Sequence, residues 1–208
     1  MMPRARPATE VLELAGRRVR LRSLTEQDYP AWIEVRRRCH DWLVPWEPRP
    51  AGAPPAPEDA SSFGVRCGMR ERERQLGTGF GFGIFVDGSF AGEITLSSVQ
   101  RGPFQQAFIG YWVDQQLAGQ GLVPESVVVV LRFAFEMLGL HRVEIAIVPR
   151  NHASRRVVEK LGIRSEGVAI GYLEIDGRWE DHVRYAITSE EWSVRRTDLL
   201  SRWIGEAA

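Results

Sequence analysis

The stretch YWVDQQLAGQGLVPESVVVV, residues 111–130, joins an aromatic strand end, a glycine-rich bend and an apolar run. Gly119 and Gly121 stand in the bend, and Pro124 opens the apolar run. A helix N-terminus carries unpaired N–H groups and a partial positive charge, and glycines before it let the backbone approach an anion closely. The stretch therefore predicts a strand–bend–helix unit, in which the bend is either a ligand-free turn or a cradle for phosphate.

The valine-rich run beyond the bend is predicted to be a helix over residues 122–138. Four valines favour a strand locally, but the run is too long for a typical strand. Pro124 and Glu125 suit a first helical turn, and Gly139 suits the end of a helix. Because the run is apolar nearly all round, we expect this helix to lie in the core.

Alternation and turn signals predict the elements on either side of the bend. Before it we expect a strand at 17–24, helices at 25–38 and 57–75, two strands joined at Asp87-Gly88, and a strand at 106–113. After it we expect a strand at 141–148, a helix between Asn151 and Gly162, a hairpin turning at Asp176-Gly177, and a final helix from about Glu190. A strand–helix–strand unit of this length makes a parallel crossover. The sequence therefore predicts one mixed sheet with helices on both faces.

The composition is typical of a soluble globular domain: 208 residues, of which 44 % are apolar and 26 % charged. The 27 basic residues balance the 27 acidic ones, which gives no electrostatic footprint for nucleic acid or anionic lipid. The longest purely apolar run, Val127–Leu131, is far short of a membrane span, and residues 1–10 lack the apolar stretch of a secretory signal. We expect a cytoplasmic protein with unpaired thiols at Cys39 and Cys67 and no metal site.

Glycine-rich segments occur twice, and they differ in the elements that come after them. Between Gly77 and Gly83 the glycines interleave with Phe80 and Phe82 and lead into a strand, so a hairpin is favoured over a phosphate loop. The bend at 118–123 lacks the third glycine of the dinucleotide fingerprint and the Gly-Lys-Ser/Thr ending of the P-loop. If the bend holds phosphate, the ligand therefore belongs to another class.

Three segments taken together resemble the GNAT superfamily of acetyltransferases: YWVDQQLAGQGLVPESV at 111–127, LGLHRVEIAIVPRNHASRRVVEKLGI at 138–163 and YLEIDGRWEDHVRYAI at 172–187. Within the superfamily they are most similar to the RimJ/RimL-type branch, which acetylates the N-terminal amine of ribosomal proteins. The resemblance implies one GNAT domain at 17–192, flanked by an N-terminal extension at 1–16 and a helical tail at 193–208. The implied fold is α/β (α+β), with a mixed, mostly antiparallel seven-stranded sheet, a splayed parallel central strand pair and helices on both faces.

The same resemblance implies acetyl-CoA as the co-substrate, with no metal. In the family, the bend cradles the pyrophosphate through backbone N–H groups; here its residues are Ala118, Gly119, Gln120, Gly121, Leu122 and Val123. The strand end that pairs with the pantetheine arm is formed here by Tyr111, Trp112 and Val113. Asn151 is expected to contact that arm from the splayed neighbouring strand, and Arg156 is expected to bind the cofactor as well.

The proton that the departing thiolate needs is expected to come from Ser154. Many GNAT enzymes place a catalytic tyrosine seven residues after this asparagine, where Val158 stands here. The RimJ/RimL-type branch instead uses a serine three residues on, which matches Ser154. Ser154 could alternatively serve only in the cap of its helix, next to Asn151.

A general base is harder to assign. Relatives commonly carry a glutamate where Phe108 stands, so no carboxylate is available at that position. Glu93 on the preceding strand and Glu174 in the last hairpin are the substitutes. Either could instead be a solvated strand residue, with water relaying the proton.

The resemblance predicts transfer of acetyl to the N-terminal α-amine of a protein, of the ribosomal-protein-alanine type, by direct attack in a ternary complex. Trp42 and Trp46, in the proline-rich segment 39–59, and Tyr172 are candidates to line the acceptor groove, or else they anchor the core. The alternatives are acetylation of a small amine such as an antibiotic or polyamine, and a non-catalytic acyl-CoA-binding module. Both a monomer and a homodimer are compatible with the sequence.

Overall fold

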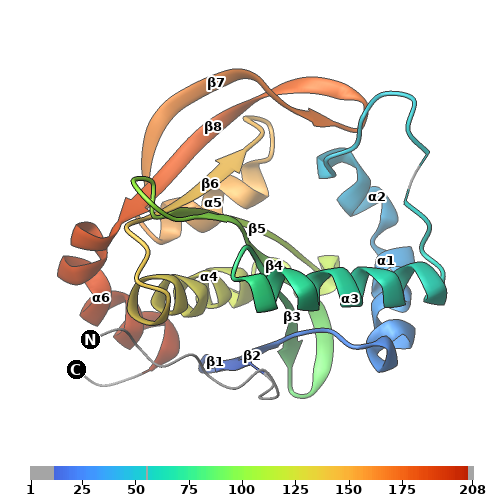
Figure 1. The fold of residues 1–208 in the computed structure, drawn as a ribbon, viewed down its shortest axis with the longest axis horizontal. Helices are drawn as coiled ribbons and strands as arrows, with labels where there is room; N and C mark the ends of the chain where they lie inside the picture. The colour runs from blue at the N-terminus through green and yellow to red at the C-terminus, as the bar shows by residue number, and fades with distance from the viewer. Residues whose placement is uncertain (1–11, 55, 206–208) are drawn as a thin grey trace.

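The computed structural model describes residues 12–54 and 56–205. Within these ranges one eight-stranded sheet has the order β1-β2-β3-β4-β5-β6-β8-β7 (Figure 1). The strands are β1 (Glu13–Ala15), β2 (Val19–Arg22), β3 (Phe80–Val86), β4 (Ser89–Gln100), β5 (Gln106–Val113), β6 (Arg142–Ile147), β7 (Arg164–Ile175) and β8 (Arg178–Thr188). The prediction of a mixed, mostly antiparallel sheet is confirmed. The strand count is eight rather than seven because β1, inside the segment assigned to the N-terminal extension, pairs with β2.

Helices lie on both faces of this sheet, as predicted. They are α1 (Tyr29–Arg38), α2 (His40–Leu43), α3 (Ala60–Leu76), α4 (Leu122–Arg132), α5 (His152–Lys160) and α6 (Ser189–Ile204), with short helical turns at Glu26–Asp28, Val44–Trp46, Gln115–Leu117 and Phe133–Met137. Apolar residues of α4, α5 and α6 share the larger core cluster with one face of the sheet. Residues of α1 and α3 share a second cluster with the other face. We refer to these as the α4 face and the α1 face.

The helix beyond the bend begins at Leu122, as expected, and every residue from Leu122 to Leu131 is buried. It continues past Arg132 into a turn of π-helix at Phe133–Met137, so the predicted length is nearly reproduced. The predicted boundary between the domain and the helical tail, at residue 192, falls inside α6. That helix runs through residue 192 without a break, and Trp192 packs in the same core as α4.

Strands β5 and β6 are parallel neighbours over only three residue pairs. Gln106, Ala107 and Phe108 pair with Arg142, Val143 and Glu144, and the pairing then stops. Beyond that point β5 remains paired with β4 as far as Val113, and β6 remains paired with β8 as far as Ile147. The two strands therefore separate toward their C-terminal ends, which leaves one edge of the β5 backbone, from Ile109 to Val113, without a neighbouring strand.

The proline-rich segment is ordered over its described residues, as predicted. Two of its residues, Glu47 and Glu58, are held by Arg36 of α1, which contacts both carboxylates. In the middle, Arg49 N donates to Glu174 O at 2.9 Å, and Asp176 N donates to Glu47 O at 3.0 Å. We call residues 47–51 the strap, because they join α1 to the β7–β8 turn, as Figure 1 shows for this stretch of chain.

Candidate active site

The bend before α4 is shaped by two glycines with positive φ. Gly119 has φ 80° and Gly121 has φ 84°, a left-handed region that favours glycine. The N–H group of Ala118 already donates to Gln115 O at 3.2 Å. The donors available to a ligand therefore begin at Gly119 and continue into the first turn of α4, where N–H groups have no partner within the helix. Leu122 and Val123 are buried, so they can contribute only backbone groups.

A buried glutamate braces the bend from behind. Glu125, fully buried in the first turn of α4, accepts from the backbone N–H groups of Arg18 at 2.5 Å and Val19 at 3.1 Å. The Arg18 guanidinium donates through Nε to Glu125 at 2.9 Å and through Nη1 to Gln120 O at 2.9 Å. Because the carbonyl of Gln120 is turned toward Arg18, the opposite side of the bend is left for an anion. The sequence reasoning missed this brace; its only local signal was an acid inside an apolar run.

Replacing Glu125 with alanine is expected to lower the free energy of unfolding by about 3 kcal/mol, since two buried N–H groups and a guanidinium lose their acceptor. Urea denaturation measures this change. The matched control is Glu34→Ala, an exposed acid paired with Arg38, for which we expect less than about 1 kcal/mol. Equal losses for the two variants would contradict the bracing role.

Ser154 and Tyr111 meet across the gap between β5 and β6. The Ser154 hydroxyl donates to the Tyr111 oxygen at 3.0 Å, and the Tyr111 hydroxyl is 3.1 Å from the Ser154 carbonyl oxygen, to which it donates. Burial raises the pKa of Tyr111 well above its usual range, against a smaller lowering by the hydrogen bond from Ser154. The phenol therefore stays protonated at neutral pH. Sequence reasoning placed Tyr111 only on the cofactor strand and missed this contact, because no local pattern links β5 to α5.

Asn151 occupies the cap position that the sequence predicted for α5. Its Oδ1 accepts from the backbone N–H of Ser154 at 3.0 Å. Since this amide is satisfied by Asn151, the Ser154 side chain is free to point toward Tyr111. Arg156, one turn further on, is exposed.

Glu93 lies on the α1 face of β4, only 8 % exposed. It accepts from Trp32 Nε1 at 2.7 Å and from Arg66 Nη1 at 3.0 and 3.1 Å. A cavity of about 20 Å³ beside it is lined by residues of α3 and β3, including Cys67 and Gly81, and not by β5. The carboxylate thus holds α1 and α3 onto the sheet, and an amine would have to displace Arg66 to reach it.

Glu174, the second candidate base, is part of the strap contact. Its Oε1 accepts from Ala51 N at 2.5 Å, and its carbonyl accepts from Arg49. Of the three proposed groove aromatics, Trp42 packs against the second core cluster. Trp46 lies under the Arg150 guanidinium, 4.8 Å from ring centroid to Cζ.

Tyr172, the third groove aromatic, is 5.5 Å from the His182 ring between centroids. The Arg184 guanidinium carbon lies 5.6 Å from the Tyr172 ring centroid. Tyr172 is therefore brought together with β8 residues on the α1 face, whereas Trp42 belongs to the packing beneath α1.

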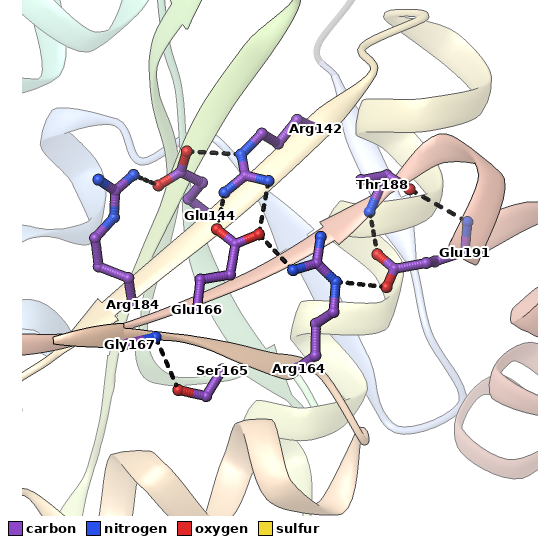
Figure 2. A network of polar contacts seen from close by, with 9 residues as sticks. All are labelled: Arg142, Glu144, Arg164, Ser165, Glu166, Gly167, Arg184, Thr188 and Glu191. Carbon is purple, nitrogen blue, oxygen red and sulfur yellow. Dashed lines mark hydrogen bonds and ion pairs between the residues drawn. The ribbon is translucent and has the colours of Figure 1, made fainter.

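A network of charged residues covers the α1 face of β6, β8 and β7 (Figure 2). Glu144, 3 % exposed, contacts both Arg142 and Arg184. Glu166 contacts Arg142 and Arg164, and the hydrogen bond from Arg142 is the main cause that lowers the pKa of Glu166 to about 2. This network links β6, β8 and β7 across the α1 face.

Glu144 is also the direct register partner of Phe108. A carboxylate therefore does lie beside the position where relatives carry an acid, but on the neighbouring strand, and two arginines already bind it. Sequence reasoning missed Glu144, because the register of β5 against β6 is not visible in either segment alone.

The geometry suits a ligand with a diphosphate and an extended arm. Clustered N–H donors at the start of α4 fit a diphosphate. The unpaired edge of β5 fits an arm that hydrogen-bonds as a strand would, and the hydroxyl pair of Ser154 and Tyr111 stands beside that edge. In the described part of the chain, no group of three or more His, Cys, Asp or Glu residues is arranged to hold a metal ion. No helix within residues 12–54 and 56–205 is long and apolar enough to cross a membrane.

Comparison with known proteins identifies the family. The sequence profile described as Acetyltransferase (GNAT) domain matches residues 18–164. The chain is 43 % identical over 112 residues to the probable N-acetyltransferase YjcK of Bacillus subtilis, which covers 53 % of this chain and 62 % of that protein. It is 33 % identical over 157 residues to the ribosomal protein uS5-alanine N-acetyltransferase of Escherichia coli, which covers 74 % of this chain and 79 % of that protein. The chain thus spans less than two thirds of YjcK.

Solved structures agree with the sequence matches. Mycobacterium smegmatis RimJ in complex with CoA-disulfide superposes with a TM-score of 0.80 at 35 % identity, over 87 % of this chain and 88 % of that one. The ribosomal-protein-S5-alanine acetyltransferase of Vibrio fischeri superposes with a TM-score of 0.77 at 26 % identity, over 87 % and 98 %. These similarities confirm the resemblance to the RimJ/RimL-type branch and the expected co-substrate. The chain belongs to the GNAT acetyltransferase family, the enzymes of which transfer an acetyl group from acetyl-CoA.

Proposed function

We propose that the chain acetylates the N-terminal α-amine of a protein. A ribosomal protein is the acceptor class that the names of its relatives suggest. The observation that carries the proposal is the strap, because it limits how an acceptor can reach the α1 face.

The strap connects α1 with the far end of the β7–β8 hairpin. On one side Arg36 holds its first residue, Glu47, and lies over Trp112 of β5, 5.7 Å from Cζ to the ring centroid. On the other side Pro48 forms a β-bridge with Ile175 at the end of β7. The last β6–β8 register pair is Ile147–Val183, whereas Ile175 pairs with Arg178, so the strap meets the β7–β8 hairpin beyond the end of β6. Such a connection limits the approach between α1 and the hairpin. This limit favours a chain end over an internal lysine, because the backbone of an internal lysine continues in both directions.

The chemistry of the amine favours the same acceptor. An α-amine has a pKa near 7.8 and a lysine amine near 10.4, so the lysine needs about 3.5 kcal/mol more for deprotonation at a given pH. Phe108 removes the acid that relatives use, and the contacts of Glu93 and Glu174 occupy both substitutes. Because these carboxylates are absent or already bound, the site is better matched to an N-terminal α-ammonium group, which loses its proton more easily than a lysine does.

Each part of the site then has one role in the transfer. The amides from Gly119 onward bind the diphosphate, and the free edge of β5 aligns the arm of the co-substrate. Backbone N–H groups on that edge polarise the thioester carbonyl. Ser154, with the protonated Tyr111 behind it, supplies a proton to the departing sulfur.

A comparison of acceptors tests the proposal. We expect release of CoA thiol at pH 7 to be at least about tenfold faster with a peptide that begins with alanine than with an N-blocked peptide containing lysine, as the difference in amine pKa implies. A polyamine serves as the third acceptor. Faster acetylation of the lysine peptide would contradict the proposal, and a preference for the polyamine would favour a small-amine substrate. Binding of acetyl-CoA with no thiol release for any acceptor would indicate a binding module.

A further inference from the structure

The acceptor side of the site contains a histidine that the transfer mechanism above leaves unused. His182 lies on β8 and is 2 % exposed. Its Nδ1 is 3.0 Å from the carbonyl oxygen of Glu180. A carbonyl oxygen can only accept, so Nδ1 carries the hydrogen. In the neutral ring Nε2 then holds a lone pair, as a proton acceptor requires.

The Nε2 atom of His182 is the ring nitrogen without a hydrogen-bond partner in the described structure. Among the described residues, only Arg184 Nε and Trp203 Nε1 are fully buried side-chain nitrogens or oxygens without a hydrogen-bond partner. Nε2 of His182 makes no hydrogen bond to the described chain, yet it is not one of these two fully buried atoms. Part of its surface must therefore be accessible. The orphaned Arg184 Nε, two residues along the same strand, is a second sign that a polar ligand completes this region.

His182 lies on the same face of the sheet as Phe108, the residue at the position where relatives commonly carry a glutamate. Residues two apart on a strand share a face, so His182 lies on the face of Arg184 and Ala186. Ala186 pairs with Glu144, which in turn pairs with Phe108. The imidazole is therefore on the α1 face, beyond the gap between β5 and β6, and on the side that the strap bridges.

The charged groups around His182 all have other partners. Glu180 contacts Arg150 at 2.6 Å, and Asp181 accepts from Gly171 N at 2.8 Å. Arg184 contacts Glu144.

From β7, the Tyr172 ring lies against the imidazole, and Ala169 is the register partner of His182. No carboxylate of the described chain hydrogen-bonds to the ring.

We propose that His182 is the catalytic base that removes a proton from the acceptor amine. This inference rests on the proposed acetyl transfer. The neutral acceptor amine forms the C–N bond with the thioester carbonyl carbon through its nitrogen lone pair, and this nitrogen gives one proton to Nε2 of His182. The C–S bond breaks as the amide forms. The CoA sulfur is protonated from Ser154, and the proton held by His182 returns through solvent to Ser154.

The first test is the pH dependence of the His182→Gln variant, with His141→Gln as the control. His141 is exposed and contacts only Glu190 through its ring. We expect kcat/KM to fall by about 10²-fold or more in His182→Gln and to stay within about twofold in the control. On the acid side, log kcat/KM should fall with slope two in the wild type, where amine and imidazole both become protonated. The slope should be one in His182→Gln.

Added imidazole provides the readout that a structural role would not move. Added imidazole should raise the activity of His182→Ala by at least about tenfold, because the small base can enter the space that the side chain vacates. Activity of His182→Gln within threefold of wild type, with slope two retained, would overturn the proposal. The same measurements apply to whichever amine proves the best acceptor, so a wrong acceptor assignment does not affect this test.

Nuclear magnetic resonance of the wild-type ring tests the proposal without turnover. We expect the neutral tautomer with hydrogen on Nδ1, seen as a ring ¹⁵N pattern that converts to the protonated form as the pH falls. A tautomer with hydrogen on Nε2 would overturn the role of His182 even if acetylation is observed. Absence of turnover with the expected tautomer would instead indicate that the proposed transferase function is wrong.

Discussion

Ser154→Ala is expected to lower kcat by about 10²-fold or more, because the departing thiolate loses its proton donor. The Kd for acetyl-CoA should stay within about threefold of the wild-type value, since the amides of the bend remain in place. Pre-steady-state thiol release and calorimetry measure the two quantities. A fall in affinity with kcat unchanged would contradict the assignment and return Ser154 to its alternative role in the helix cap.

The partner variant Tyr111→Phe separates two ways in which the pair could act. It keeps the ring, which packs against the larger core cluster, and removes the hydroxyl that contacts Ser154. If the two hydroxyls work as one unit, the double variant should be no slower than the slower single variant. If the losses of activity in the two single variants multiply in the double variant, each hydroxyl contacts a different reacting atom.

Gly92→Ala is expected to lower the free energy of unfolding by about 3 kcal/mol or more. A Cβ at this position would stand 2.3 Å from Trp112 O and 2.8 Å from Val113 Cα, and both are backbone atoms that cannot rotate away. Gly92 also has φ 156°, a conformation that side chains rarely adopt. Strain and overpacking each cost about 1–3 kcal/mol. Because the displaced strand is β5, acetyl-CoA affinity should fall as well.

The same substitution at Gly68 provides the control for Gly92→Ala. Gly68 lies in the interior of α3, and a Cβ there would meet nothing within 4 Å. Gly68→Ala should therefore stabilise the protein by about 0.5–1 kcal/mol, through the helix preference of alanine. Urea denaturation of the two variants should show changes of opposite sign in the free energy of unfolding. Equal stability of Gly92→Ala and the wild type would show that β5 can shift away from β4 at little cost.

The bend before α4 shows how far local reasoning reaches. Its two glycines, the first helical turn and the buried valine run are all properties of about twenty consecutive residues. Asn151 as a cap and Asp176-Gly177 as a turn are equally local, and the structure confirms both. These features were predictable because helix caps, turns and strand alternation depend on neighbours within a few positions.

The catalytic side of the site was not predictable in the same way. Tyr111 and Ser154 are separated by 43 positions, and Arg18 and Glu125 by 107. The order of acids along the chain suggests Glu93 and Glu174 as bases, and it gives no reason to single out Glu144 or His182. The roles of these residues depend on which strands are adjacent and in what register.

By itself, the sequence determined the bend, the family to which the chain belongs, and the order of the elements apart from β1 and the short α2. The tertiary structure decided which side chains meet: Tyr111 with Ser154, Glu144 beside Phe108, and the strap with the β7–β8 turn. The physical reason is the range of the interactions. Caps, turns and alternation act within a few residues, whereas register and the separation of β5 from β6 follow from the packing of the whole sheet against its helices.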